Sequence, residues 1–154
     1  MRDKERIQQQ ELDNYNRAID IFNSLFKEKP IYKQMPEFSV SDMRMQYHTN
    51  KYNIELKSRG TSIYEYNEQP LKVKKYINLM KDTKEDETLL YVAEIEDGYY
   101  YIWNLSDIAV CDMRLDNMWS NKQQFNIGGS NKICEPYFFL TLDSACCKGH
   151  LPLS

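Results

Sequence analysis

The stretch FSVSDMRMQYHTNKYNIELKS (38–58) contains two strand-like segments joined by a short polar bend. Apolar and polar residues alternate in both segments, most clearly over residues 51–58. Alternation with a period of two is typical of a β-strand that has one face buried. Thr49 and Asn50 between the segments suit a two-residue turn, so the stretch predicts a β-hairpin.

The expected hairpin brings three charged side chains together. A turn at positions 49–50 puts Asp42 directly opposite Lys57. Side chains alternate between the two faces of a strand, so Glu55 shares the face of Lys57. Glu55 is then a diagonal neighbour of Asp42, within about 7–8 Å. This geometry depends on the turn, because a bend with an odd number of residues would point Asp42 to the opposite face.

Two carboxylates and an ammonium group on one strand face are costly to hold together unless a bound ion organises them. The oxygens of Asp42 and Glu55 suit a hard divalent cation such as Mg²⁺, with water and a substrate phosphate as further ligands. Lys57 beside such an ion can orient an attacking water or deprotonate it. This set of groups suits hydrolysis of a phosphodiester bond. The alternative is a solvated sheet face with a cross-strand ion pair.

Helices are expected on both sides of the hairpin. Upstream, apolar residues recur at intervals of three and four over residues 4–28, and this helix should end before Pro30. Residues 29–37 then form a loop or a short irregular strand. Downstream, Pro70 is expected in the first turn of a helix that runs to about Lys81.

A second hairpin is the clearest pattern in the rest of the chain. After an acidic run at 82–87, which we expect to be solvated, LLYVAEIEDGYYYIWNL (89–105) has two β-rich segments around Asp97-Gly98. Asp-Gly between apolar runs is a strong indication of a hairpin turn. EPYFFLTL (135–142) predicts a last strand.

The order of expected elements defines a fold class. Residues 106–135 are ambiguous apart from a turn at Gly128-Gly129, so the order is helix, hairpin, helix, hairpin, irregular stretch, strand. This order predicts an α/β single domain with a mixed central β-sheet flanked by helices. We expect one domain over 1–154, with a core at about 5–142 and a poorly ordered tail at 143–154.

The charged residues resemble those of the PD-(D/E)XK, or restriction-endonuclease-like, nuclease superfamily. These nucleases carry an acidic residue on one strand and a Glu-x-Lys tripeptide on the adjacent strand, and Asp42 and Glu55-Leu56-Lys57 have that arrangement. The expected order of elements is also similar to the helix–strand–strand–strand–helix–strand core of the family. The resemblance covers roughly residues 5–108 and implies a restriction-endonuclease-like core.

The stretch from IELKSRG (54–60) through KKYINL (74–79) to the hairpin at 89–105 also resembles small phage and bacterial members of the family. In these members the Glu-x-Lys strand is followed by a lysine-bearing helix and a strand pair, as expected here from IELKSRG (54–60) to the hairpin at 89–105. Ser41 stands where the family name has proline. The third strand of the core is expected either in residues 30–37 or in FSVSDM (38–43).

The resemblance implies a deoxyribonuclease that depends on Mg²⁺ or Mn²⁺. Asp42 and Glu55 would bind the metal ion, and the backbone carbonyl of Leu56 would be a further ligand. Lys57 would be the catalytic lysine that positions or activates the water attacking phosphorus. DNA is the expected partner.

Further site residues are implied by the same resemblance. Many members place a glutamate on the first helix facing the site, and Glu11 is our candidate, with Glu5 in reserve. Arg59, on the strand face of the catalytic lysine, and Lys75, on the following helix, would contact the DNA backbone. The simpler alternatives are an exposed helix glutamate and an ordinary solvated face of helix lysines.

Composition limits the other classes of function. The net charge is −3, so the chain is not a generally basic protein that coats nucleic acid. The N-terminal MRDKERIQQQ is charged, and no apolar run approaches the roughly 20 residues that span a bilayer, so we expect a cytoplasmic protein without membrane contact. A domain this small often needs a second copy to grip a duplex, which leaves a homodimer open.

Two other functions remain open from the sequence. The first is a catalytically inactive nuclease-fold protein that acts as a protein- or DNA-binding module. The second is a protein-binding domain whose interface is the tyrosine-rich hairpin at 89–105. The four cysteines lack paired spacing and are expected as free thiols rather than zinc ligands. His48 is expected in the turn rather than as a general base.

Overall fold

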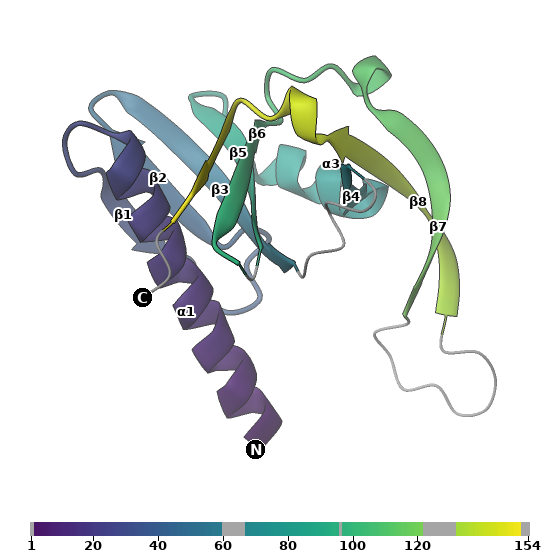
Figure 1. The fold of residues 1–154 in the computed structure, drawn as a ribbon, viewed down its shortest axis with the longest axis horizontal. Helices are drawn as coiled ribbons and strands as arrows, with labels where there is room; N and C mark the ends of the chain where they lie inside the picture. The colour runs from purple at the N-terminus through teal and green to yellow at the C-terminus, as the bar shows by residue number, and fades with distance from the viewer. Residues whose placement is uncertain (1, 60–66, 96, 122–131, 152–154) are drawn as a thin grey trace.

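Residues 2–59, 67–95, 97–121 and 132–151 are described by a computed structural model of the chain. Figure 1 shows their arrangement. The helices are α1 (Arg2–Leu25) and α3 (Val73–Asp82), with short 3₁₀ turns at η1 (Val110–Asp112) and η2 (Leu142–Ser144). The strands are β1 (Ile31–Gln34), β2 (Met43–Tyr47), β3 (Asn50–Arg59), β4 (Glu68–Lys72), β5 (Glu87–Ile95), β6 (Tyr99–Asn104), β7 (Arg114–Asn121), β8 (Lys132–Thr141) and β9 (Cys147–His150).

The strands form two sheets. The larger sheet has the order β1-β2-β3-β5-β6-β9, and it is mixed because β3 and β5 run parallel while the other neighbours are antiparallel. The smaller antiparallel sheet, β4-β8-β7, was not expected, and β7 and β8 project to one side as a long curved pair (Figure 1). The expected single α/β domain with a mixed central sheet is confirmed.

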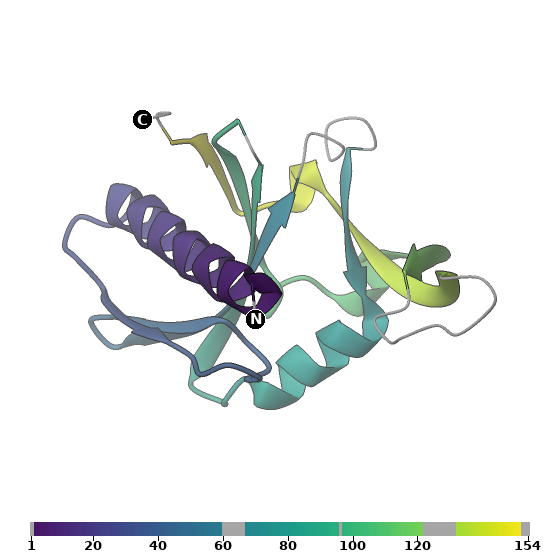
Figure 2. The ribbon, with the colours of Figure 1, turned by 90° about the horizontal axis from the view of Figure 1, so that it is seen from below.

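The two helices cover opposite faces of the larger sheet (Figure 2). On one face Ala18, Ile21 and Phe22 of α1 pack against apolar side chains of β2, β3 and β5. On the other face Tyr76 and Leu79 of α3 pack against β5, β6 and the smaller sheet. Each helix therefore buries one apolar stripe, which is the usual source of helix stability in a small domain.

The first hairpin forms with a turn one residue earlier than expected. Tyr47 pairs with Asn50, so the turn consists of His48 and Thr49, and His48 has a positive φ of 54°. The prediction of Thr49-Asn50 was wrong in position, but the turn still contains two residues and the faces are kept. The alternation in the sequence could not show this register, because a shift by two residues leaves every side chain on the same face.

The segment before β2 is not a strand. Residues 37–42 form a turn and bends, and Phe38 has a φ of 69° and is 96% exposed, so the alternation expected at 38–41 was wrong. The strand that joins β2 and β3 in the sheet is instead β1, which pairs with β2 from Ile31↔Gln46 to Gln34↔Met43. The alternative that placed this strand in residues 30–37 is the correct one.

Pro70 does not open the second helix, as we had expected. It lies in β4, opposite Phe139 of β8, and α3 begins only at Val73. β4 is an edge strand of the smaller sheet, where a residue without an N–H group disrupts no second ladder. The helix therefore begins three residues after Pro70 rather than at Pro70 itself.

The C-terminal part contains one confirmed hairpin and one correction. β5 and β6 form the expected hairpin, with Gly98 at a φ of 90° in its turn. β8 includes most of the predicted strand at 135–142, while the predicted turn at Gly128-Gly129 lies outside the described residues. The tail was expected to be poorly ordered, but it forms β9, because its backbone completes the edge of the larger sheet beside β6.

The helices also bear on the expectation of no membrane contact. Among the described residues, neither helix combines the length and the apolar character that crossing a membrane requires.

Candidate active site

The charged residues of the first hairpin meet at the start of β2, where β3 continues beyond its β2 partner. β2 has 5 residues and β3 has 10, so the second half of β3 has no β2 neighbour. Asp42 directly precedes the last pair of the ladder, Met43↔Ile54, and its N–H donates to the carbonyl oxygen of Ile54 at 3.1 Å. Its Oδ2 accepts a hydrogen bond of 2.7 Å from the backbone N–H of Leu56. The Asp42 carboxylate thus accepts the hydrogen bond that the backbone of a longer β2 would have accepted.

Glu55 follows Ile54 and is the direct neighbour of Asp42, whereas we had expected Lys57 to be opposite that aspartate. The earlier turn shifts the register by two residues, which explains the difference. The Glu55 side chain is only 12% exposed, and its Oε2 lies 3.0 Å from Nζ of Lys75. Its Oε1 is fully buried and accepts no hydrogen bond from any described residue.

The surroundings of Glu55 disfavour its charge. Its pKa is raised to about 8, mainly by burial and then by the nearby Asp42 carboxylate, which acts through repulsion and through the hydrogen bond that a protonated Glu55 shares with it. The ammonium group of Lys75 partly opposes this shift. A second positive charge near the buried Oε1 of Glu55 would compensate that oxygen. Asp42 and Glu55 together therefore have the character of a cation site.

Lys57 lies on the same face of β3, two residues beyond Glu55. Its side chain is exposed as a whole, but burial around its ammonium group lowers its pKa. Repulsion from Arg59 lowers it too, the Glu55 carboxylate acts in the opposite direction, and Lys72 and Lys75 add smaller repulsions. Five charged groups thus lie within electrostatic reach of one another, and the amine is shifted toward its neutral, basic form.

A cavity of about 90 Å³ opens beside Asp42 on the side of α1. Asp42 and Leu56 line it from the sheet, and Glu11, the candidate from the first helix, lines it from α1; the reserve candidate Glu5 does not. The remaining lining residues come from α1, from the end of β1 and from the turn that follows. They are Asn14, Tyr15, Gln34, Met35, Pro36, Glu37, Phe38, Ser39 and Ser41.

The oxygen groups fit a hard divalent cation as a partial ligand set. Within the described parts of the chain, no three His, Cys, Asp or Glu side chains come together as a ready metal cluster, so Glu11 shares the cavity without completing one. Mg²⁺ commonly uses only one or two carboxylates and keeps several waters. Asp42 and Glu55, with the unpartnered buried Oε1, meet that smaller requirement.

The two predicted DNA contacts are both turned inward. Arg59 is half-buried, its Nε is buried without a hydrogen-bond partner among the described residues, and its charge lies near the hydroxyl group of the buried Tyr91. Lys75 donates to the carbonyl oxygen of Val40 at 2.6 Å in addition to its ion pair with Glu55. Contact of either cation with DNA remains a prediction.

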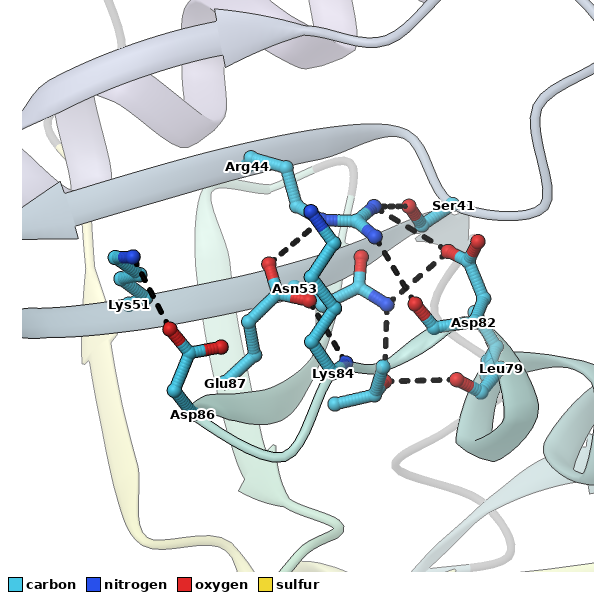
Figure 3. A network of polar contacts seen from close by, with 10 residues as sticks. Ser41, Arg44, Lys51, Asn53, Leu79, Asp82, Lys84, Asp86 and Glu87 are labelled. Atoms are coloured by element: carbon cyan, nitrogen blue, oxygen red, sulfur yellow. Dashed lines mark hydrogen bonds and ion pairs between the residues drawn. The ribbon is translucent and has the colours of Figure 1, made fainter.

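A buried polar network beside the site was missed by the sequence analysis (Figure 3). Arg44 of β2 donates from Nε to Glu87 at 2.9 Å, from Nη1 to the hydroxyl oxygen of Ser41 at 2.6 Å, and from Nη1 and Nη2 to Asp82. Ser41 directly precedes Asp42, so this guanidinium holds the segment that carries the first acid. The acidic run at 82–87 is therefore not simply solvated, because two of its carboxylates bind this arginine.

The same network fixes the end of α3. The fully buried Asn53 donates to Asp82 at 3.2 Å and to Thr83 at 2.9 Å, and Thr83 in turn donates to the carbonyl oxygen of Leu79. The sequence carried one indication of it: Arg44 stands between two methionines that the strand period buries, and Asn53 occupies the facing position.

The remaining candidates have structural places. His48 lies in the hairpin turn, as expected. Tyr100 is buried and Tyr101 half-buried, while Tyr99 is 43% exposed, so most of the tyrosine-rich hairpin belongs to the core rather than to an open surface. All four cysteines are free thiols, as expected.

A comparison with protein-family models, with curated proteins and with solved structures finds no match for the chain. We therefore base its function on the geometry of its own side chains.

Proposed function

We propose that this chain is a nuclease that hydrolyses DNA phosphodiester bonds with Mg²⁺ or Mn²⁺. The observation that carries this proposal is the adjacency of Asp42 and Glu55 at the start of β2, with Lys57 next along the same face of β3. An acid pair with one buried oxygen that has no donor attracts a cation, and an amine with a lowered pKa beside it suits proton transfer.

The order of the elements supports the same proposal. Among the described residues, α1, β1, β2, β3, α3 and β5 follow one another as helix, three strands, helix and strand, with the short β4 inserted before α3. This is the element order of the restriction-endonuclease-like core that the sequence resembles. Asp42 directly precedes the second strand, and Glu55-Leu56-Lys57 lies on the third.

In the proposed mechanism Asp42 and Glu55 would hold the metal ion, together with the Leu56 carbonyl. The ion would supply charge neutralisation at the scissile phosphate and would acidify a water molecule. Lys57 positions the attacking water and accepts its proton, because its lowered pKa makes the neutral amine accessible. Glu11, which lines the same cavity as Asp42, would orient a water that enters from the α1 side.

A second candidate is a nuclease-fold module that binds DNA or protein without cutting. The contact that favours it is the Lys75–Glu55 ion pair, because a lysine seated on the second acid can replace a metal ion permanently. The group of Lys57, Lys72 and Lys75 would then serve only to bind phosphate.

Supercoiled plasmid incubated with Mg²⁺ or with a chelator separates the two candidates. The nuclease is expected to nick or degrade the plasmid only with Mg²⁺, and Glu55→Ala and Lys57→Ala are expected to leave it intact. Lys51→Met is a matched control, because Lys51 lies at the opposite end of β3 and pairs with the exposed Asp86. Equal survival of the plasmid with wild type and with both variants would favour the binding module.

A further inference from the structure

Lys75 places its positive charge directly beside Glu55, the second residue of the acid pair. Its Nζ lies 3.0 Å from Glu55 Oε2 and 2.6 Å from the carbonyl oxygen of Val40. The Lys75 side chain is 36% exposed, whereas that of Glu55 is 12% exposed. The ammonium group therefore reaches the acid from the solvent side, at the end of a long flexible side chain.

A divalent ion and this ammonium group cannot both keep their places. An ion bound to Glu55 would lie within a few ångströms of Nζ, where two cations repel strongly in a partly buried setting. Lys75 can leave because its four-carbon side chain has a path to solvent. Its departure also releases the carbonyl of Val40, which lies two residues before Asp42, so the segment that carries the first acid loses one of its holds.

We propose that Lys75 is a displaceable internal counter-ion that competes with the divalent metal for Glu55. This inference rests on the proposed function, because it assumes that the acid pair accepts a metal ion. Before metal binds, Lys75 compensates the buried carboxylate. When metal binds, the ammonium group is expelled toward solvent at the start of α3, near Lys72 at the end of β4.

Titration of the full chain with Mn²⁺, without DNA, tests the competition. Lys75→Met is expected to bind Mn²⁺ roughly ten-fold more tightly than wild type, because no charge-assisted hydrogen bond has to be broken first. Lys74→Met is the matched control, since Lys74 is its exposed neighbour on α3, and it is expected to stay within about two-fold of wild type. Lys75→Arg retains a cation and is expected to resemble wild type, which keeps the test decisive if the methionine variant fails to fold.

The chemical reactivity of Lys75 is a second readout. Reductive methylation followed by peptide mass spectrometry is expected to modify Lys75 slowly in the metal-free protein and several-fold faster at saturating Mn²⁺. Lys74 should react equally in both states. Faster modification of Lys75 alone would support its displacement.

The outcomes separate this inference from the proposed function. If wild type binds Mn²⁺ and Glu55→Gln abolishes binding, while Lys75→Met changes neither affinity nor reactivity, the counter-ion role is overturned and the metal site stands. Binding of Mn²⁺ by Lys75→Met alone supports the competition in its strongest form. If neither protein binds Mn²⁺, both the inference and the metal-dependent function are overturned.

Discussion

The carboxylate of Asp42 accepts a hydrogen bond of 2.7 Å from the backbone N–H of Leu56. The Leu56 N–H lies beyond the last β2–β3 pair, and it holds the Asp42 carboxylate that the proposed site requires. The residue before Leu56 on β3 is Glu55. The sheet itself therefore forms the site. Because the β2–β3 ladder stops at Met43, the edge of β3 beside Glu55 is left without a strand partner.

Lys57 is expected to be required for hydrolysis but not for metal binding. Lys57→Met should lower the rate of DNA hydrolysis about 10²- to 10⁴-fold, the usual contribution of a general acid–base group. Mn²⁺ affinity should be unchanged or higher, because a nearby positive charge is removed. Single-turnover kinetics and Mn²⁺ titration of the same preparation check both parts. Loss of metal binding in parallel with the rate would instead make Lys57 a structural residue.

The metal-free protein is expected to lose stability as the pH rises through the titration of Glu55. Its pKa is about 8 in the folded protein against 4.5 as the reference value, so the folded state holds this proton more tightly. The associated stability is fully present below pH about 4.5 and is lost as the pH rises through about 8.

Urea unfolding in a chelator over this range checks the pH dependence. Glu55→Gln should remove most of the slope and should be more stable than wild type above pH about 8. The same slope in both proteins would show that another group titrates.

Arg44 is expected to stabilise the fold through its buried ion pairs. Its side chain is 18% exposed, and that of its partner Glu87 is 7% exposed. Arg44→Met should cost about 3 kcal/mol, because it leaves buried carboxylates without their counter-charge. Lys51→Met breaks an exposed pair with Asp86 and should cost less than about 1 kcal/mol. Similar free energies of unfolding for the two variants, measured with urea, would contradict a structural role for the network.

Lys75 is expected to contact DNA only when metal is bound. In the Lys57→Met background, which keeps the DNA intact, adding Lys75→Met should weaken binding of a labelled duplex in Mn²⁺ and reduce the salt slope by about one. Without Mn²⁺ the two proteins should bind alike, because Lys75 remains on Glu55. Fluorescence anisotropy measures both conditions, and an equal loss with and without Mn²⁺ would show that Lys75 contacts DNA independently of the metal.

Local patterns predicted the elements that local chemistry determines. The alternation in residues 51–58 predicted β3, and the Asp97-Gly98 turn predicted the second hairpin. Both patterns depend on only a few neighbouring residues. The shared face of Glu55 and Lys57 follows from the same period. The acid before the neighbouring strand lies beside Glu55 rather than opposite Lys57, and it stays near this pair because the actual turn, like the expected one, has two residues.

Tertiary contacts decided the features that the sequence did not predict. The turn at His48-Thr49 keeps every side chain on the face expected for it, so the alternation did not reveal the shift. Pro70 lies in β4 because β8, far along the chain, pairs with it. The pairing of Lys75 with Glu55 joins a helix to a strand and has no local pattern. Such long-range contacts leave no periodic trace in one sequence.

The most direct test of the metal-dependent nuclease is the cleavage of a DNA oligonucleotide in Mg²⁺, followed by mass spectrometry, with wild type, Asp42→Asn, Glu55→Gln and the double variant. Wild type should give hydrolysed fragments. Each single variant should be slower by at least about a hundred-fold, and the double variant no slower than either, because the two acids act as one unit. Intact oligonucleotide with wild type, or undiminished cleavage by Glu55→Gln in a correctly folded protein, would contradict the assignment.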